Sequence, residues 1–323
     1  MSKVAVVGVV GRTNAGKSTL VNALVGEKVS IVSPVEQTTR NTIRGIVADP
    51  RGQLVLLDTP GLHKAVGELG RLLNRMARRS AAGTDVTCVV FDASQEPQLE
   101  DVGWMQRVVR ERTERVVFAL NKADKSPFFE TMFRDAWREA AEGGHEGHEG
   151  CEGREVPVPL VPSEPLAQPE PVWVTCSAST PGGAAPVADA LFGLAEEGEK
   201  LFDDDIATDY PRKLAIADVI REKYLARMHQ EVPHELGVLV KSVKDEGSRW
   251  CVDAEVLVNR PSQKPIVIGR GAETIKYVRK CAERELKDIF GVKVALELWV
   301  RVEPGWMKNE RLLAEMGYLG NLV

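Results

Sequence analysis

The 323-residue sequence predicts an α/β domain with a mostly parallel sheet, followed by a smaller α+β domain. Strand-like apolar runs alternate with helix-like stretches as far as about Phe202, which favours a parallel sheet with helices on both faces. The length is sufficient for two domains with separate cores. We therefore divide the chain into residues 1–202, a linker at 203–211 and residues 212–323.

The first domain begins with an apolar, β-branched run at residues 4–10 and continues, after a glycine-rich segment, with a helix-forming stretch at 18–24. The intervening segment 11–18, GRTNAGKS, fits the pattern GxxxxGK[ST]. Its glycines allow a tight turn with inward-facing N–H groups, and the following helix adds unpaired donors, so the loop suits phosphate groups. Taken alone, the motif is also compatible with a plain glycine turn before a Rossmann-like helix.

Several side chains near this loop have the chemistry of a nucleoside triphosphate site. Lys17 would reach the β and γ oxygens as a mobile cation, and the Ser18 hydroxyl would bind a magnesium ion. Asp58 follows a buried strand at 54–57, at the strand end where parallel sheets bind ligands. The Thr38-Thr39 pair offers a second magnesium hydroxyl, on a loop that the γ phosphate would order.

The DTPG segment at 58–61 also bears on hydrolysis, because the Gly61 N–H would approach the γ phosphate. Many GTPases carry a water-orienting glutamine directly after this glycine, whereas this sequence has Leu62. We therefore expect intrinsic hydrolysis to be slow, or to recruit another group.

The NKAD segment at 121–124 predicts which base is bound. It follows an apolar strand at 116–120, so its side chains would lie at the same sheet edge. The Asp124 carboxylate can accept hydrogen bonds from guanine N1–H and the 2-amino group, whereas adenine would leave this charged acceptor unpaired. The sequence therefore predicts GTP rather than ATP, with Ser177-Ala178 backing the base after a strand at 172–175.

The second domain contains a short basic loop, GRGA at 269–272, before an amphipathic helix at 272–289. A Gly-x-x-Gly-like loop at a helix start can clamp a nucleic-acid backbone, although glycine turns before helices are also common in general. Residues 212–323 carry a net charge of +4 and residues 1–211 a net charge of −9, which favours polyanion binding by the second domain. The expected elements of this domain are a helix at 212–228, strands at 237–243 and 250–258, a helical segment, a strand at 293–302 and a docked helical segment at 306–318.

Together these segments resemble the Era family of bacterial GTPases over nearly the whole chain, apart from one insertion. The shared stretches are GRTNAGKST, PVEQTTRNTIRG, DTPGLHK, NKAD and CSA, then REKYLARMHQEVPHELGV, VIGRGAETIK, LELWVRVEPGW and Met316-Gly317-Tyr318. The resemblance implies a P-loop GTPase domain and a KH domain of type II. It also implies a small-subunit assembly factor that binds the 3′ end of small-subunit ribosomal RNA under control of its GTP state. A monomer in the cytoplasm, with peripheral association with the inner face of the cell membrane, is expected.

The motifs and the resemblance assign the site residues. For catalysis we expect Lys17, Thr39, Asp58 and Gly61, and for magnesium Ser18, Thr39 and Asp58, since the family's Thr-Thr-Arg pattern favours the second threonine. For GTP and GDP we expect Gly11, Asn14, Ala15, Gly16, Lys17, Ser18, Thr19, Asp58, Thr59, Gly61, Asn121, Lys122, Asp124, Ser177 and Ala178. For RNA we expect Gly269, Arg270, Gly271, Ala272, Ile275 and Lys276.

Three residues qualify this assignment. Thr13 stands where the family usually has proline, which frees φ but removes no ligand. Ala272 stands where the KH loop usually ends in a second glycine, and alanine tolerates a positive φ poorly. Asn14 occupies a position that in related P-loops binds a potassium ion beside the β and γ phosphates, so we expect potassium to accelerate hydrolysis.

The remaining features set limits. Residues 142–171 hold Glu-Gly-His repeats and a proline-rich run, and we expect a disordered, solvated loop rather than a zinc site at His145, His148 and Cys151. Five widely spaced cysteines suit a reducing cytosol. No apolar run approaches the ~20 residues of a membrane span.

Three classes of function compete: a GTPase switch acting on ribosomal RNA, a membrane-associated GTPase with an unrelated tail, and a non-catalytic RNA-binding module. A relic nucleotide fold would be free to lose its site residues, so the third class is disfavoured by the intact Lys17, Ser18, Asp58 and Asp124. The KH-like half argues against the second. The first class is therefore the prediction.

Overall fold

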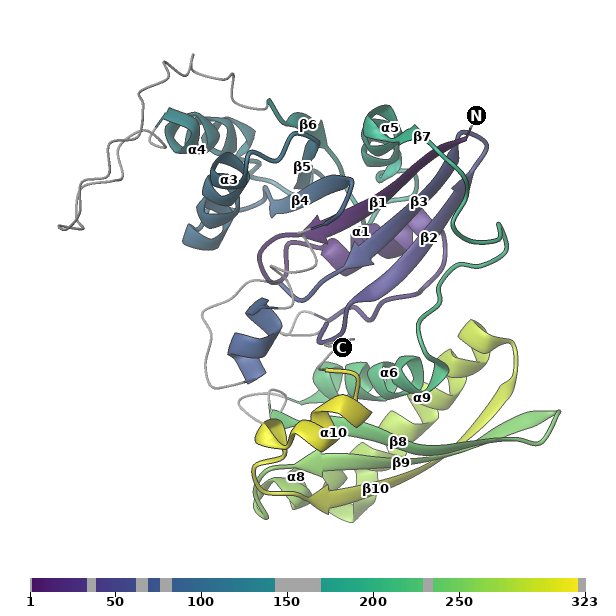
Figure 1. The fold of residues 1–323 in the computed structure, drawn as a ribbon. Helices are drawn as coiled ribbons and strands as arrows, with labels where there is room; N and C mark the ends of the chain where they lie inside the picture. The colour runs from purple at the N-terminus through teal and green to yellow at the C-terminus, as the bar shows by residue number, and fades with distance from the viewer. Residues whose placement is uncertain are drawn as a thin grey trace, which may run out of the picture.

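The computed structural model describes residues 2–33, 39–61, 69–75, 83–142, 170–228 and 235–318. Two sheets, each packed with helices, lie one above the other (Figure 1). The first part contains β1 (Lys3–Val10), α1 (Lys17–Val25), β2 (Ile43–Asp49), β3 (Gly52–Asp58), β4 (Val86–Asp92), α3 (Leu99–Glu111), β5 (Val116–Asn121), α4 (Glu130–Glu142), β6 (Val172–Thr175), α5 (Ala185–Leu194) and β7 (Glu196–Glu197). Residues 69–75 are also helical.

The first sheet is mostly parallel, as predicted. Its order in the described residues is β2-β3-β1-β4-β5-β6, with the short β7 antiparallel to β1. Along this path only the β2-β3 hairpin is antiparallel. The strand order places β1 in the middle of the sheet, so the loop that follows it emerges at the carboxyl edge where ligands bind in such folds.

The strands are almost continuously apolar because both faces of the sheet are covered. In β1, Ala5, Val7 and Val9 pack on the side of α1 and α5, whereas Val10 packs on the side of α3 and α4. The same alternation continues in β4 and β5. The prediction of a sheet with helices on both faces is therefore confirmed.

The second part has the order helix, two strands, two helices, strand, which is that of the type II KH fold. Its elements are α6 (Arg212–Arg227), β8 (Gly237–Asp245), β9 (Arg249–Val258), α8 (Gln263–Ile268), the 3-10 turn η2 (Arg270–Ala272), α9 (Glu273–Phe290), β10 (Lys293–Val302), η3 (Trp306–Lys308) and α10 (Glu310–Glu315). The sheet order is β10-β9-β8, with β9 and β10 parallel and β8 and β9 antiparallel. Helices α6 and α9 cover one face through a core that includes Ile220, Tyr224, Val278 and Leu286.

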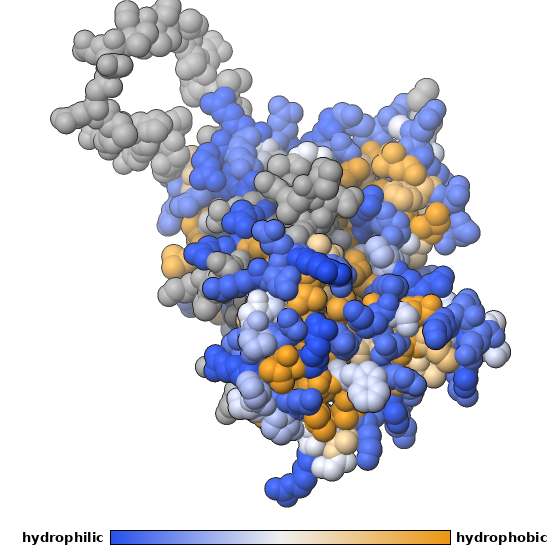
Figure 2. Space-filling model, turned by 60° about the horizontal axis from the view of Figure 1, so that its bottom comes forward, coloured by the Kyte–Doolittle hydropathy of each residue, from blue (hydrophilic) through white to orange (hydrophobic). Residues whose placement is uncertain are grey.

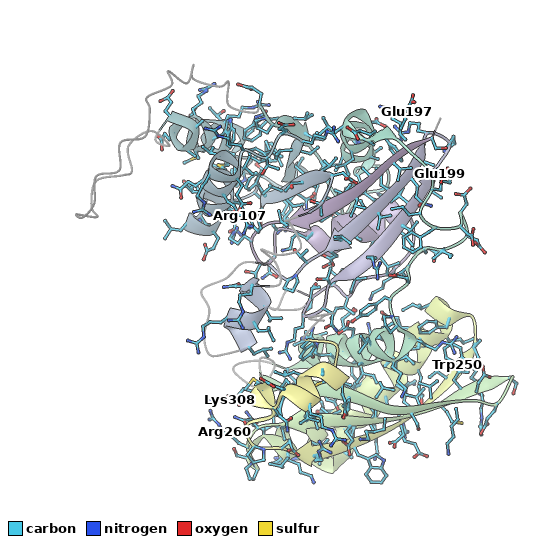
Figure 3. All side chains as sticks on the ribbon, viewed as in Figure 1. Arg107, Glu197, Glu199, Trp250, Arg260 and Lys308 are labelled. Atoms are coloured by element: carbon cyan, nitrogen blue, oxygen red, sulfur yellow. The ribbon has the colours of Figure 1, made fainter. Side chains whose placement is uncertain are left out.

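The C-terminal segment, residues 306–318, lies against the second sheet and against the first part of the chain. Its Trp306, Leu313 and Tyr318 share a buried cluster with Leu239 of β8 and with the helical residues 69–75. The expectation that this segment docks is confirmed. Figure 3 shows Lys308 of this segment and Arg260 at one end of the second part, with Trp250 at the other.

Hydrogen bonds also fix the path of the segment between the two sheets. The Gln53 side chain accepts from the backbone N–H of Leu201 and Phe202 at 2.9 and 3.0 Å. The Ile46 N–H donates to Ala207 O at 2.8 Å, so the segment runs beside β2. The segment is therefore hydrogen-bonded to the first sheet before the chain enters α6.

On the face of the molecule shown in Figure 2, hydrophilic residues predominate and apolar residues form smaller patches. Among the described helices none combines the length and hydropathy needed to cross a bilayer. The described residues as a whole contain no group of three or more His, Cys, Asp or Glu that could hold a metal ion. His145, His148, Cys151 and almost all of the 142–171 insertion lie outside the described residues.

Candidate nucleotide site and RNA-binding loop

The loop after β1 depends on glycine at two positions. Gly11 has φ +143°, and a Cβ there would lie 2.3 Å from Val90 O. Gly16 has φ +97°, and a Cβ there would lie 2.3 Å from Asn121 Nδ2. Any side chain at either position would push the loop away from its neighbouring strands. Asn14 also has a positive φ, 61°, in a region that asparagine enters more readily than most residues.

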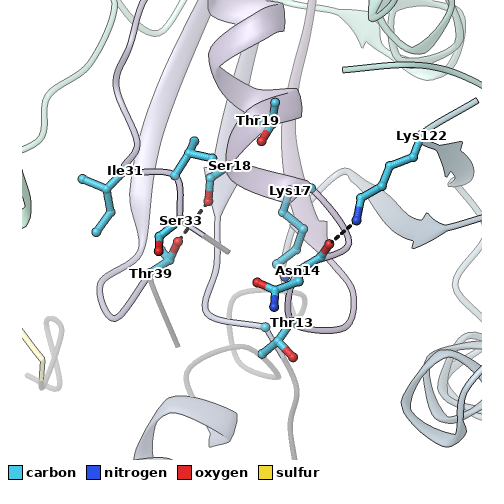
Figure 4. Close-up of a pocket in the computed structure, with 12 residues that line it drawn as sticks. Thr13, Asn14, Lys17, Ser18, Thr19, Ile31, Ser33, Thr39 and Lys122 are labelled. Atoms are coloured by element: carbon cyan, nitrogen blue, oxygen red, sulfur yellow. Dashed lines mark hydrogen bonds between the residues drawn. The ribbon is translucent and has the colours of Figure 1, made fainter. Parts of the chain in front are cut away.

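A pocket of about 370 Å³ lies beside this loop (Figure 4). Its lining residues are Thr13, Asn14, Gly16, Lys17, Ser18, Thr19, Ile31, Val32, Ser33, Thr39, Gly61 and Lys122. The predicted phosphate residue Lys17 and the predicted magnesium residues Ser18 and Thr39 thus line one pocket. Residues 31–33 were not predicted, because no motif distinguishes them in the sequence. The predicted residues that do not line it are Gly11, Ala15, Asp58, Thr59, Asn121, Asp124, Ser177 and Ala178.

Lys17 is buried at the base of the pocket. Its ammonium donates to Arg12 O at 2.8 Å and to Gly11 O at 3.2 Å. Burial lowers the pKa of Lys17 to about 8, an effect that the nearby Asp58 partly opposes. A buried ammonium needs a strong counter-charge, and phosphate oxygens would supply one here.

The three predicted magnesium residues lie together. Ser18 Oγ and Thr39 Oγ1 are 2.9 Å apart, and Thr38 lies outside the described residues. Asp58 is completely buried, and neither carboxylate oxygen has a hydrogen-bond partner of acceptable geometry. Burial raises the pKa of this carboxyl, and Ser18 and Lys17 offset the effect only in part. Two hydroxyls beside an unsatisfied carboxylate form an oxygen donor set that fits magnesium.

The DTPG segment passes very close to the phosphate-binding loop. A Cβ at Gly61 would lie 2.7 Å from Lys17 Nζ and 2.7 Å from Thr13 N, so only glycine fits. The Thr59 hydroxyl donates to Val9 O at 2.9 Å and joins the ends of β3 and β1. Its side chain therefore holds the two strands together and does not face the pocket.

Asn121 joins three motifs of the site. Its Nδ2 donates to Ala15 O at 2.9 Å, and its Oδ1 accepts from the Ala178 N–H at 3.0 Å. The side chain is buried, with a relative exposure of 2%. Asn121 therefore fixes the NKAD segment against both the phosphate-binding loop and the Ser177-Ala178 segment.

Asp124 lies at the exposed end of the NKAD segment. The Ser177 hydroxyl donates to its carboxylate and holds its pKa below the ordinary value. The Ala123 N–H donates to Cys176 O at 3.1 Å, which fixes the backbone beneath it. Asp124 is thus an ionised, accessible acceptor, as recognition of guanine requires.

Sequence reasoning missed Asp92, the last residue of β4. Lys122 donates to its carboxylate and also to Asn14 O at 2.8 Å. Burial would raise the pKa of Asp92, but the hydrogen bonds from Lys122 and Ser94 hold it below the ordinary value. Asp92 thus anchors Lys122 over the phosphate-binding loop. An available signal was its place at the carboxyl end of an apolar run, the same position that singled out Asp58.

The GRGA loop lies between α8 and α9, and three of its four residues have a positive φ. Gly269 has φ 79°, and a Cβ there would lie 2.4 Å from Thr274 Oγ1. Gly271 has φ 59° with open space around it. Ala272 has φ 63° and ψ 27°, the left-handed conformation that alanine adopts only at a cost. Its place in this turn differs from the prediction that the helix begins at residue 272.

Replacing Ala272 by glycine should stabilise the protein. Relief of the left-handed alanine would contribute about 1 kcal/mol, reduced by the greater freedom of glycine in the unfolded chain. Urea denaturation of the full chain should show a higher midpoint for Ala272→Gly. Gly271→Ala, in the same loop at φ 59°, is the matched control and should lower the midpoint. Equal midpoints for all three proteins would contradict the strain argument.

The side chains around this loop differ in their availability. Arg270 is exposed, whereas the Lys276 ammonium donates to Gly271 O at 3.3 Å and so also braces the loop. Ile275 is half-buried. Two exposed residues nearby were not predicted, Ile266 and Tyr277, with relative exposures of 54% and 48%. Ile266 and Tyr277 therefore place exposed apolar surface near the loop, and the Arg227 guanidinium lies 4.6 Å from the centre of the Tyr277 ring.

This fold and these two sites define a P-loop GTPase domain joined to a KH domain. A family model described as a 50S ribosome-binding GTPase matches residues 6–122, and a KH domain model matches residues 231–307. The chain belongs to the GTPase Era family. GTPase Era of Geobacter sp. (strain M21) is 34% identical over 313 residues, which cover 97% of this chain and 96% of the relative. GTPase Era of Lacticaseibacillus paracasei is 33% identical, with coverage of 97% and 95%.

Two solved structures are similar over almost the full length. One is a crystal structure of Era with MgGDPNP and nucleotides 1506–1542 of 16S ribosomal RNA, with a TM-score of 0.82, 30% identity, and coverage of 98% of this chain and 99% of that one. The other is Aquifex aeolicus Era, with one tyrosine replaced by alanine, bound to GDP·AlF4⁻; its TM-score is 0.81 at 30% identity, with the same coverage. The expected family and both expected folds are confirmed.

Proposed function

We propose that this chain is a GTP-hydrolysing switch that binds the 3′ end of small-subunit ribosomal RNA and assists assembly of the small ribosomal subunit. The proposal rests on one observation: Lys17, Ser18, Thr39 and Asp58 lie together at a nucleotide site, and the same chain carries a KH loop. The similarity to an Era bound to MgGDPNP and a 16S ribosomal RNA fragment supports the same ligands here.

Each residue of the nucleotide site has a proposed task. Lys17 holds the β and γ phosphates, and Ser18, Thr39 and Asp58 would hold magnesium. When bound, magnesium neutralises charge that develops on the phosphates during hydrolysis. Asp124 selects guanine. Intrinsic turnover is slow, because residue 62 is a leucine and cannot orient the attacking water.

The proposed domain division is 1–202, 203–211 and 212–323. It is supported by the two sheets, which fall entirely within the first and last of these ranges. A cytoplasmic monomer with peripheral contact at the inner face of the cell membrane is also part of the proposal, on the strength of the family resemblance.

Potassium should accelerate hydrolysis through Asn14, which lines the pocket beside Lys17. A fixed monovalent cation would offset phosphate charge that an arginine meets in other GTPases. We expect the hydrolysis rate to rise at least several-fold when potassium replaces sodium, and Asn14→Ala to remove this rise. Asn14→Gly removes the same amide without strain at φ 61° and should behave alike. Equal rates in the two salts would exclude the potassium site.

The function itself is tested by two measurements on the full chain. GTP hydrolysis is followed by phosphate release, and RNA is crosslinked to the protein with GDP or a non-hydrolysable GTP analogue, then sequenced. We expect hydrolysis, and fragments from the 3′ end of small-subunit ribosomal RNA. Hydrolysis without bound RNA would favour a membrane-associated GTPase, and RNA without hydrolysis would favour a non-catalytic module.

A further inference from the structure

Arg40, the residue after Thr39, is buried in the second part of the molecule. Its relative exposure is 1%, and its Nη1 donates to Leu236 O at 2.9 Å. The guanidinium carbon lies 6.0 Å from the centre of the Trp306 ring and 5.7 Å from that of Tyr318. The Arg40 guanidinium thus lies in a slot formed by the rings of Trp306 and Tyr318 in the C-terminal segment.

The slot is itself well fixed. Trp306 is fully buried, and its Nε1 donates to Glu235 O at 3.0 Å. The Tyr318 N–H donates to Leu313 O at 2.8 Å. Burial lowers the pKa of Arg40 to about 10. Removal of one partner of a buried cation is strongly unfavourable, so Arg40 and the slot should move together or not at all.

The next residue strengthens the same connection. Asn41 Nδ2 donates to the Tyr210 hydroxyl at 2.7 Å and to Met316 O at 3.2 Å. On the other side of Arg40, Thr39 Oγ1 lies 2.9 Å from Ser18 Oγ. Adjacent Cα atoms are about 3.8 Å apart, so the position of residue 40 constrains that of residue 39. Three consecutive residues therefore connect the proposed magnesium hydroxyl to the C-terminal segment.

We propose that Arg40 is a positioning residue for Thr39, and that the Trp306–Tyr318 slot holds it in place. The C-terminal segment thereby controls whether Thr39 is available to magnesium. Residues 39–41 thus couple the nucleotide site to the KH domain. This inference rests on the proposed function. The coupling is reciprocal: a nucleotide state that draws Thr39 inward also stabilises the occupied slot.

The test measures how much magnesium is needed for half-maximal binding of a non-hydrolysable GTP analogue to the full chain. Arg40→Ala should raise this concentration about tenfold, within the range of typical coupling, and leave GDP binding unchanged. Arg40→Lys keeps the charge but loses the planar guanidinium, so it should recover part of the loss. A purely structural role for Arg40 would lower stability without changing the magnesium dependence.

Lys28→Ala is the matched control. Lys28 forms a different charged contact between the two parts, an ion pair with Glu222 at 2.8 Å and another with Glu285, and it is not adjacent to Thr39 in the sequence. Its loss should loosen the two parts without raising the magnesium requirement. A rise equal to that of Arg40→Ala would overturn the proposal, because general loosening would then explain both.

Tyr318→Leu tests the slot from its other side and decides the matter if Arg40→Ala fails to fold. Tyr318→Leu should also raise the magnesium concentration needed for half-maximal binding. The double variant Arg40→Ala/Tyr318→Leu should raise it by less than the two single effects combined. Unchanged magnesium dependence in both variants would overturn the positioning role. Failure of the wild-type chain to bind GTP or RNA would instead overturn the proposed function, so the two failures are distinguishable.

Discussion

Asp124→Asn should lower the affinity for GTP about 100-fold and raise the affinity for xanthosine triphosphate. The carboxylate accepts from guanine N1–H and the 2-amino group, and loss of charge-assisted hydrogen bonds of this kind has an effect of that order. An amide presents a donor where the carboxylate accepted, and this donor matches the 2-oxo group of xanthine. Because Asp124 is exposed, the fold should be unaffected.

Competition between the two nucleotides for the wild-type and variant proteins measures this change. Ser177→Ala is a useful comparison, since Ser177 donates to Asp124 without itself defining the base. It should weaken GTP binding modestly and leave xanthosine triphosphate disfavoured. An unchanged preference for GTP in Asp124→Asn would remove Asp124 from the specificity role.

The phosphate end of the site could be predicted because each motif is a short stretch between recognisable elements. A strand, a glycine loop and a helix fix where Lys17 and Ser18 lie, and the end of a buried strand fixes Asp58. The predicted strand bounds and the helix bounds 18–24, 212–228 and 272–289 agree with the structure to within two residues, because each of these elements has a clear hydrophobic pattern.

Contacts between distant segments could not be predicted in this way. The role of Asn121 as a clamp depends on Ala15 and Ala178, which only the folded sheet brings together. Asp92 at the end of β4 accepts a hydrogen bond from Lys122, and nothing in the NKAD segment indicates that partner. Arg40 would be read as a surface cation in a polar loop, yet the C-terminal segment buries it. In each case the missing information is tertiary packing rather than local propensity.

The KH loop contains one feature that the sequence predicted and one that it could not predict. The sequence identified Ala272 as a departure from the family pattern, and the structure places it in the left-handed conformation that makes the departure costly. Lys276 was predicted to bind RNA. Its bond to Gly271 O indicates that it also shapes the loop, a contribution that spacing along a helix cannot show.

Gly269→Asp should abolish detectable binding of RNA from the 3′ end of small-subunit ribosomal RNA. At φ 79° a Cβ would lie 2.4 Å from Thr274 Oγ1 and 2.7 Å from Thr274 N, so the loop must shift. The added carboxylate would also repel phosphate groups. GTP binding by the first part of the chain should remain intact, and it serves as the control for folding.

Because Gly269→Asp strains the backbone, Arg270→Ala provides a variant without that defect. Arg270 is exposed, so its loss should weaken binding across sequences and reduce the salt dependence by about one unit of slope. Lys276→Ala should do the same and, because it also braces the loop, weaken binding further. Titration of labelled RNA at several salt concentrations measures both quantities. Wild-type affinity in Gly269→Asp, with an unchanged slope in Arg270→Ala, would place the RNA site elsewhere on the molecule.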